Sequence, residues 1–150
     1  MHVTFLPLTA DAATRTGART VLSRTVEADA AADACWASLL GGCASVKRWG
    51  LDQRLRQLSQ ATCEIAGKKW WFGDGAPHRR RVAHAQGRIE EAITDGDGPE
   101  FAAAFAGYDH AMATVLVAAS NHRRAARRRT TAARPVPGAG VRGEDSSVRS

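Results

Sequence analysis

The chain has few aromatic residues, few lysines and no framework of cysteines. Aromatic side chains make up 6% of the 150 residues, with a single tyrosine. Strands depend on aromatic and β-branched side chains, whereas the 30 alanines favour helix, because alanine has the highest intrinsic helix propensity. This composition argues against a β-sheet protein and predicts an all-α fold of three to four helices.

The three cysteines, Cys35, Cys43 and Cys63, form an odd set without the spacing of a disulfide framework or of a zinc site. We expect them to be reduced and to act as small apolar residues. The N-terminus has no basic segment followed by a long apolar stretch, and no run reaches the roughly 18 apolar residues that a bilayer requires. These absences predict a cytoplasmic protein without a membrane span.

The chain also has no catalytic, cofactor-binding or metal-binding motif. Gly73-x-Gly75 lacks the third glycine and the preceding strand of a dinucleotide-binding loop. In the segment 95–100, DGDGPE, a proline occupies the third ligand position of a calcium loop. Asp109 and His110 are neighbours on one predicted helix and diverge, so they do not pair as orienting acid and base. We therefore predict no enzyme activity, no cofactor and no metal site.

Helical periodicity is the main structural signal. Residues 1–17 are interpreted as an extended or weakly ordered lead-in, and a helix over roughly 18–40 ends at Gly41-Gly42. Its apolar stripe is weak and consists of Leu22, Val26, Ala30, Ala34, Ala37 and Leu40. Residues 51–71 carry a clearer stripe, made of Leu51, Leu55, Leu58, Thr62 and Ile65. The segment 72–77 then interrupts the helical pattern.

Residues 78–125 predict an antiparallel helical hairpin. Two stripes flank the turn 95–98, in which Asp97 and Glu100 have the spacing of a capping box and Pro99 suits a first helical turn. We assign residues 18–129 to one helical domain and residues 130–150 to a disordered cationic tail. The Ala-rich first helix offers little apolar area, which predicts a homodimer that completes its core. The stripes of the hairpin are Val82, Ala85, Ile89 and Ala92, then Phe101, Phe105, Tyr108, Met112, Val115 and Ala119.

Charge is unevenly distributed along the chain. From Met1 to Asn121 acids and bases balance, thirteen against thirteen, and the whole net charge of +6 lies in the last 29 residues. If the hairpin folds back on itself, the bases at the start of its first arm, at the end of its second arm and at the end of the preceding helix meet at one end. We predict that this end binds nucleic acid through Lys68, Lys69, Trp71, Arg79, Arg80, Arg81, Arg123, Arg124, Arg127, Arg128 and Arg129.

Phosphate is the expected ligand, because the guanidinium group binds it in a bidentate manner. A solvated helix surface is the alternative. It accounts for Arg123–Arg129, since cations near a helix C-terminus are stabilised by the dipole, but the same dipole opposes Arg79–Arg81 near a helix start. For Trp70 and Trp71, one ring could stack on a base, or both could pack in the core.

Two other functions remain open. The hairpin could dock a partner protein, which would make the chain an interaction adaptor. Ser45–Trp49 after Gly41-Gly42 is similar to the recognition element of helix-turn-helix regulators, but the spacing is about two residues short and Gly50 truncates the helix. The alternative for that segment is a connector with a buried Trp49.

Residues 78–119, HRRRVAHAQGRIEEAITDGDGPEFAAAFAGYDHAMATVLVAA, resemble helical hairpins of small accessory proteins of conjugative plasmids and integrative elements in high-GC bacteria. These include the spread or transfer-accessory proteins encoded beside the transfer ATPase. The resemblance covers about a third of the chain and depends on the helical pattern and the DGDGPEF turn. It implies a role in plasmid transfer or its regulation and transfers no site residues. The lack of a membrane segment separates this chain from membrane-bound members of such loci.

Overall fold

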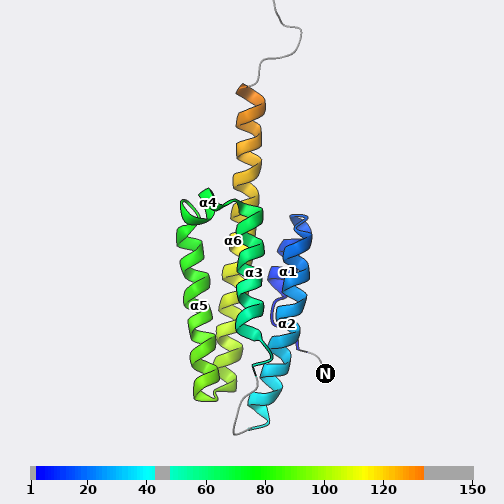
Figure 1. Ribbon diagram of the computed structural model, residues 1–150, viewed down its shortest axis with the longest axis vertical. Helices are drawn as coiled ribbons and strands as arrows, with labels where there is room; N and C mark the ends of the chain where they lie inside the picture. The colour runs from blue at the N-terminus through cyan, green and yellow to red at the C-terminus, as the bar shows by residue number, and fades with distance from the viewer. Residues whose placement is uncertain (1–2, 43–47, 134–150) are drawn as a thin grey trace, which may run out of the picture. The chain divides into compact units, whose positions relative to one another are not determined.

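A computed structural model describes residues 3–42 and 48–133, and within these residues the chain is all-α. The chain divides into two compact units, Met1–Ser120 and Asn121–Ser150. The described residues form six helices, four of which have 16 or more residues (Figure 1). Their bounds are α1 (Pro7–Arg15), α2 (Arg19–Leu40), α3 (Leu51–Ala66), α4 (Lys68–Phe72), α5 (Ala76–Asp95) and α6 (Gly98–Ala133).

The predicted weakly ordered lead-in, residues 1–17, is wrong, because Pro7–Arg15 is a helix. Its N-terminal amides are capped from α6: Leu8 and Thr9 donate backbone N–H bonds to the carboxylate of Asp109 at 3.0 and 2.8 Å. The Thr9 hydroxyl donates to the same carboxylate at 2.7 Å. Local sequence contains no cap for this helix, since the preceding Leu6 makes no side-chain capping bond. A residue 100 positions away therefore stabilises α1.

The segment before α1 is also anchored. Asp29 of α2 accepts a hydrogen bond from the backbone N–H of Phe5 at 3.1 Å, and the side chains of Phe5 and Leu6 are buried. The Phe5 ring lies edge-on to Phe101 and Phe105 of α6, with centroids 5.6 and 5.3 Å apart. These contacts make the N-terminal segment part of the core of the first unit.

The apolar stripes predicted for residues 51–71 and 78–119 face the core. Leu51, Leu55 and Leu58 of α3 are fully buried, as are the aromatic positions of the α6 stripe. Gly67, with φ +90°, separates α3 from α4. The segment 51–71, predicted as one helix, is therefore divided between two helices. Thr62 of α3 contacts the sulfur of Met112 in α6 at 3.6 Å, which places α6 behind α3 (Figure 1).

The helix predicted over 18–40 is confirmed as Arg19–Leu40, but the predicted buried face is wrong. Val26 and Leu40 are each 61% exposed, whereas Val21, Ala28, Ala32 and Cys35 are fully buried. The neighbours α1 and α3 pack on this small-residue face. In an alanine-rich helix the two faces differ little in hydrophobicity, so tertiary packing decides which is buried. The homodimer stays a prediction. The exposed apolar residues of α2 that a second copy could cover are Val26 and Leu40.

A two-residue connection, Gly96–Asp97, joins α5 to α6. Gly96 has a left-handed backbone with φ +65°, which ends α5, and Asp97 accepts a hydrogen bond from the backbone N–H of Glu100 at 3.0 Å, which caps α6. The Glu100 carboxylate does not complete a capping box but pairs with Arg88 of α5. The predicted extension of the hairpin to residue 125 passes into the second unit, where residues 121–133 continue as helix.

Among the described residues, α6 is the one helix that is long and apolar enough to cross a bilayer by length and composition. In its most apolar stretch the mean hydropathy is 1.3, and 44% of that stretch is buried inside the protein. A core helix passes the same test, so the absence of a membrane span stays a prediction, as does the cytoplasmic location. The predicted disordered tail lies outside the described residues, except that Thr130–Ala133 belong to α6.

Candidate nucleic-acid interface

The connection between α4 and α5 is tight because of two glycines. A Cβ on Gly75 would lie 2.7 Å from the Trp70 ring and 2.9 Å from the Trp70 carbonyl oxygen. A Cβ on Gly73 would lie 2.7 Å from the carbonyl oxygen of Lys69. The two glycines of the motif Gly73-x-Gly75 therefore allow α5 to start directly against Trp70, whose ring stacks on His78 with centroids 6.1 Å apart.

This connection brings five cations together in the first unit. Lys68 and Lys69 lie on α4, and Arg79 reaches back from α5 to donate an Nε–H bond to the Trp71 carbonyl oxygen at 3.4 Å. We call this group the basic patch: Lys68, Lys69, Arg79, Arg80 and Arg81. Arg79 is half-buried and the other four are exposed.

None of the ion pairs between described residues involves the basic patch. The pairs lie elsewhere in the first unit, for example Arg48 with Glu90 at 2.5 Å and Arg24 with Glu27 at 2.9 Å. Asp74 is the single acid in the sequence between residues 67 and 81, which contains all five cations. The patch thus keeps its positive charge available to a ligand.

Trp71 is 6% exposed and Trp70 is 7% exposed. Of the two alternatives for this pair, the structure therefore has both rings packed in the core, and Trp71 offers no open ring face for stacking on a base. The exposed aromatic side chain of α4 is Phe72, which is 61% exposed, and the guanidinium carbon of Arg79 lies 5.2 Å from its ring centroid. Sequence reasoning missed Phe72, although the end of a short helix before Gly73 is a position where a ring can stay outside the core.

The five C-terminal bases of the predicted site, Arg123, Arg124, Arg127, Arg128 and Arg129, belong to the second unit. There they are exposed along the final turns of α6. The structure thus brings Lys68 and Lys69 together with Arg79–Arg81. A shared site between them and the C-terminal bases stays a prediction.

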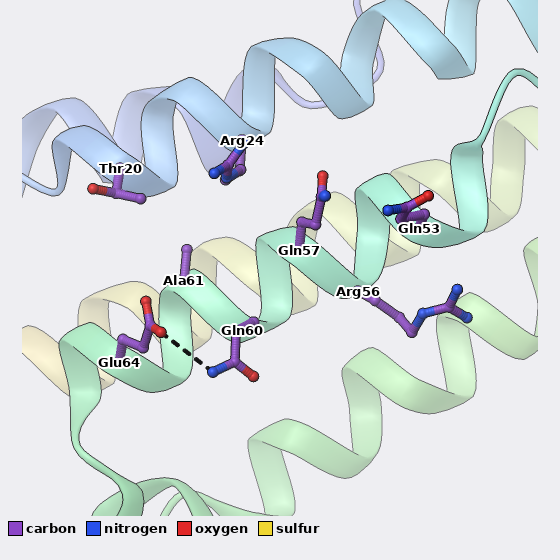
Figure 2. Close-up of a pocket in the computed structure, with 8 residues that line it drawn as sticks. All are labelled: Thr20, Arg24, Gln53, Arg56, Gln57, Gln60, Ala61 and Glu64. Carbon is purple, nitrogen blue, oxygen red and sulfur yellow. Dashed lines mark hydrogen bonds between the residues drawn. The ribbon is translucent and has the colours of Figure 1, made fainter.

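Two hollows flank α3 in the first unit. The α2–α3 hollow, of about 380 Å³, is polar and is lined by Arg24, Gln57 and Glu64 among others (Figure 2). In Figure 2 Gln57 points toward α2, Gln60 donates a hydrogen bond to Glu64 at 3.3 Å, and Arg56 points away from α2 toward α5. The Phe72 hollow, of about 270 Å³, lies on that other side of α3. Arg56 and Gln60 line both hollows.

An acidic pair lies near the start of α3. Burial raises the pKa of Glu90, the neighbouring Asp52 carboxyl raises it further, and the guanidinium of Arg48 opposes the shift. Burial also raises the pKa of the nearby Cys35 thiol to about 11, against the lowering effect of Arg48, so this thiol stays protonated at neutral pH. Among described residues no group of three His, Cys, Asp or Glu side chains is placed to hold a metal ion.

The segment proposed as a recognition element is only partly described, since Ser45–Lys47 lies outside the described residues. Arg48 and Trp49 precede α3 and are not helical, and Arg48 is paired with Glu90. Trp49 has a positive φ of 56° and is exposed, so the alternative of a buried Trp49 is wrong as well. A recognition helix that includes these two residues is not present.

Comparison of the chain with protein-family models, with curated proteins and with solved structures finds no match. Any function proposed for this protein therefore depends on the residues of the chain itself.

Proposed function

We propose that this protein is a non-enzymatic accessory protein that binds nucleic acid through the basic patch. The observation that carries the proposal is that five cations meet at the α4–α5 connection with no acidic partner among the described residues. Clustered, unpaired cations attract a polyanion, and arginine and lysine together bind successive phosphates without sequence preference.

The position of Arg79 supports the proposal further. Arg79 is the fourth residue of α5, which starts at Ala76, so the positive end of the helix dipole disfavours this cation, and the first turn contains no acid to offset it. Stability of α5 therefore does not explain an arginine here, whereas phosphate binding does.

The test is fluorescence anisotropy of labelled oligonucleotides with the full chain across a range of salt concentrations. We expect Lys68→Gln/Lys69→Gln to weaken binding and to reduce the salt dependence, log K against log salt, by about 0.7 to 0.9 for each phosphate that the variant no longer binds. Arg15→Gln/Arg19→Gln, on α1 and at the start of α2, removes the same charge and is the matched control. Equal effects of the two double variants would show that only net charge matters and would refute the site.

A second double variant distinguishes a binding site from an ordinary solvated surface. Arg80→Gln/Arg81→Gln should weaken nucleic-acid binding while changing the free energy of unfolding by less than about 0.5 kcal/mol, because both cations are exposed and lie beyond the first turn of α5. A solvated surface without function predicts the same small change in stability with no loss of binding. A complex with a protein that survives high salt and nuclease treatment would instead support the interaction adaptor.

The role in plasmid transfer or its regulation is a separate proposal, which depends on the resemblance of residues 78–119. The antiparallel hairpin over 78–125 is a further proposal, which depends on the two apolar stripes that flank the turn at Gly96–Asp97. A transfer ATPase encoded beside this gene would support the role, and a genomic neighbourhood without transfer functions would count against it.

A further inference from the structure

The Phe72 hollow adjoins the basic patch and differs from it in chemistry. Its walls come from three helices: Arg56 and Gln60 from α3, Trp71 and Phe72 from α4, and Gln86 from α5. Phe72 is shared between the two features, because Arg79 of the patch lies against its ring. A ligand that occupies the hollow therefore extends directly onto the cations.

The polar groups of the hollow are available. The side-chain amide of Gln86 makes no hydrogen bond with any described residue, and Arg56 takes part in none of the ion pairs between them. Gln60 uses one N–H on Glu64 and keeps its amide oxygen and second N–H. Amides that offer both a donor and an acceptor match the edge of a nucleobase.

The aromatic side chains supply the other half of a base site. The Phe72 ring is 61% exposed, while the neighbouring Trp71 is buried. An exposed ring beside an arginine and amides that keep free donors and acceptors is typical of the stacking platforms that bind unpaired bases, with phosphates held by flanking cations. A base inside a duplex has both faces covered by its neighbours and does not reach such a ring.

We propose that the Phe72 hollow binds one unpaired base of a single-stranded nucleic acid whose flanking phosphates lie on the basic patch. The inference rests on the proposed function and deepens it, because it names the form of nucleic acid. Gln60 and Gln86 contact the edge of the base, Phe72 stacks on its face, and Arg56 holds a phosphate at the junction with the α2–α3 hollow.

The experiment compares a single strand with the duplex of the same sequence, by anisotropy with the full chain at one salt concentration. Wild-type protein should bind the single strand more tightly. Phe72→Ala should weaken single-strand binding between about 5-fold and 150-fold, the range for loss of one stacked base, and weaken duplex binding much less, because the duplex loses only the contact between Phe72 and Arg79. Phe72→Trp should keep the single-strand affinity. Gln86→Ala should reduce it without altering duplex binding.

Val26→Ala is the matched control, since Val26 is also 61% exposed but lies on α2. If Phe72→Ala lowers single-strand and duplex binding equally, or lowers neither, the base site is refuted while phosphate binding by the patch stands. If the wild-type protein prefers the duplex, the base site is likewise refuted. If neither nucleic acid binds, the proposed function fails and the base site fails with it.

Discussion

Asp109 is the residue whose loss tests the fold most directly. It is 3% exposed, and its carboxylate accepts hydrogen bonds from the backbone N–H groups of Leu8 and Thr9 and from the Thr9 hydroxyl. These bonds cap α1 from α6, across 100 positions of sequence. Replacing Asp109 with alanine should therefore weaken the attachment of α1 and lower the free energy of unfolding.

The size of the effect follows from the two amides. Thr9 is fully buried, so its N–H would lose its partner without access to water, which costs about 1 to 3 kcal/mol. Leu8 is exposed, and water can replace part of its bond, which leaves the loss of an ordinary N-cap at about 1 kcal/mol. Relief of the buried charge offsets part of the total. With this offset subtracted from the sum, we expect Asp109→Ala to destabilise the protein by about 1 to 3 kcal/mol.

The helix should stay bound in this variant. Phe5 and Leu6, just before α1, are buried, and each such side chain contributes about 1.5 to 3 kcal/mol of burial free energy. This burial holds the segment in place, but its opening becomes easier. Amide hydrogen exchange should thus rise in peptides that cover residues 3–15 before it rises in α3 or α5.

Urea unfolding followed by far-UV circular dichroism measures the stability change, and mass spectrometry measures the exchange. Asp109→Asn keeps one oxygen acceptor and should lose less than the alanine variant. Asp11→Ala, which removes an exposed carboxylate from α1 itself, should change stability by less than about 0.5 kcal/mol. If the free energy of unfolding of Asp109→Ala lies within about 0.5 kcal/mol of the wild-type value, the carboxylate does not hold α1 and the reasoning is wrong.

Two further changes test the acidic pair and the α4–α5 connection. The pKa of Glu90 is raised in the folded state, so its contribution to stability is present in full below its ordinary pKa and is lost as pH rises through the folded value. Asp52→Asn removes one cause of the shift and should flatten that fall between acid and neutral pH, measured by urea unfolding at several pH values. An unchanged slope would show that the two carboxyls do not interact. Gly75→Ala should destabilise by about 1 to 3 kcal/mol, because the new Cβ would lie 2.7 Å from the Trp70 ring. Gly87→Ala, with open space around the position in α5, should stabilise by about 0.5 to 1 kcal/mol, and equal effects at the two glycines would contradict the packing argument.

The buried face of a helix was predictable where bulky apolar residues recur. The leucines of α3 and the aromatic stripe of α6 differ so strongly from their polar neighbours that only one orientation buries them. The face of α2 was not predictable in this way. Its alanines fit on either side, and close packing against α1 and α3 selected the small residues Ala28 and Ala32 and left Val26 outside.

The candidate site likewise has features that are predictable from the sequence and features that depend on how the helices pack. The run of lysines, aromatic residues and arginines between 68 and 81 was visible as a cationic cluster from composition alone. Which ring faces solvent was not visible, because Trp71 and Phe72 are adjacent on a five-residue helix and only the packing of α5 against it decides between them. Gln86 and Arg56 gave no local signal, because a hollow between helices exists only once their side chains meet.

The sequence by itself determined the helical class, the turn at Gly96–Asp97 and the charge available at residues 68–81, because propensity, capping and charge are local properties. The tertiary structure alone decided that Asp109 caps α1 and that Phe72 borders a hollow. These features join residues that are distant in sequence, and no short-range pattern encodes a contact whose two halves lie on different helices.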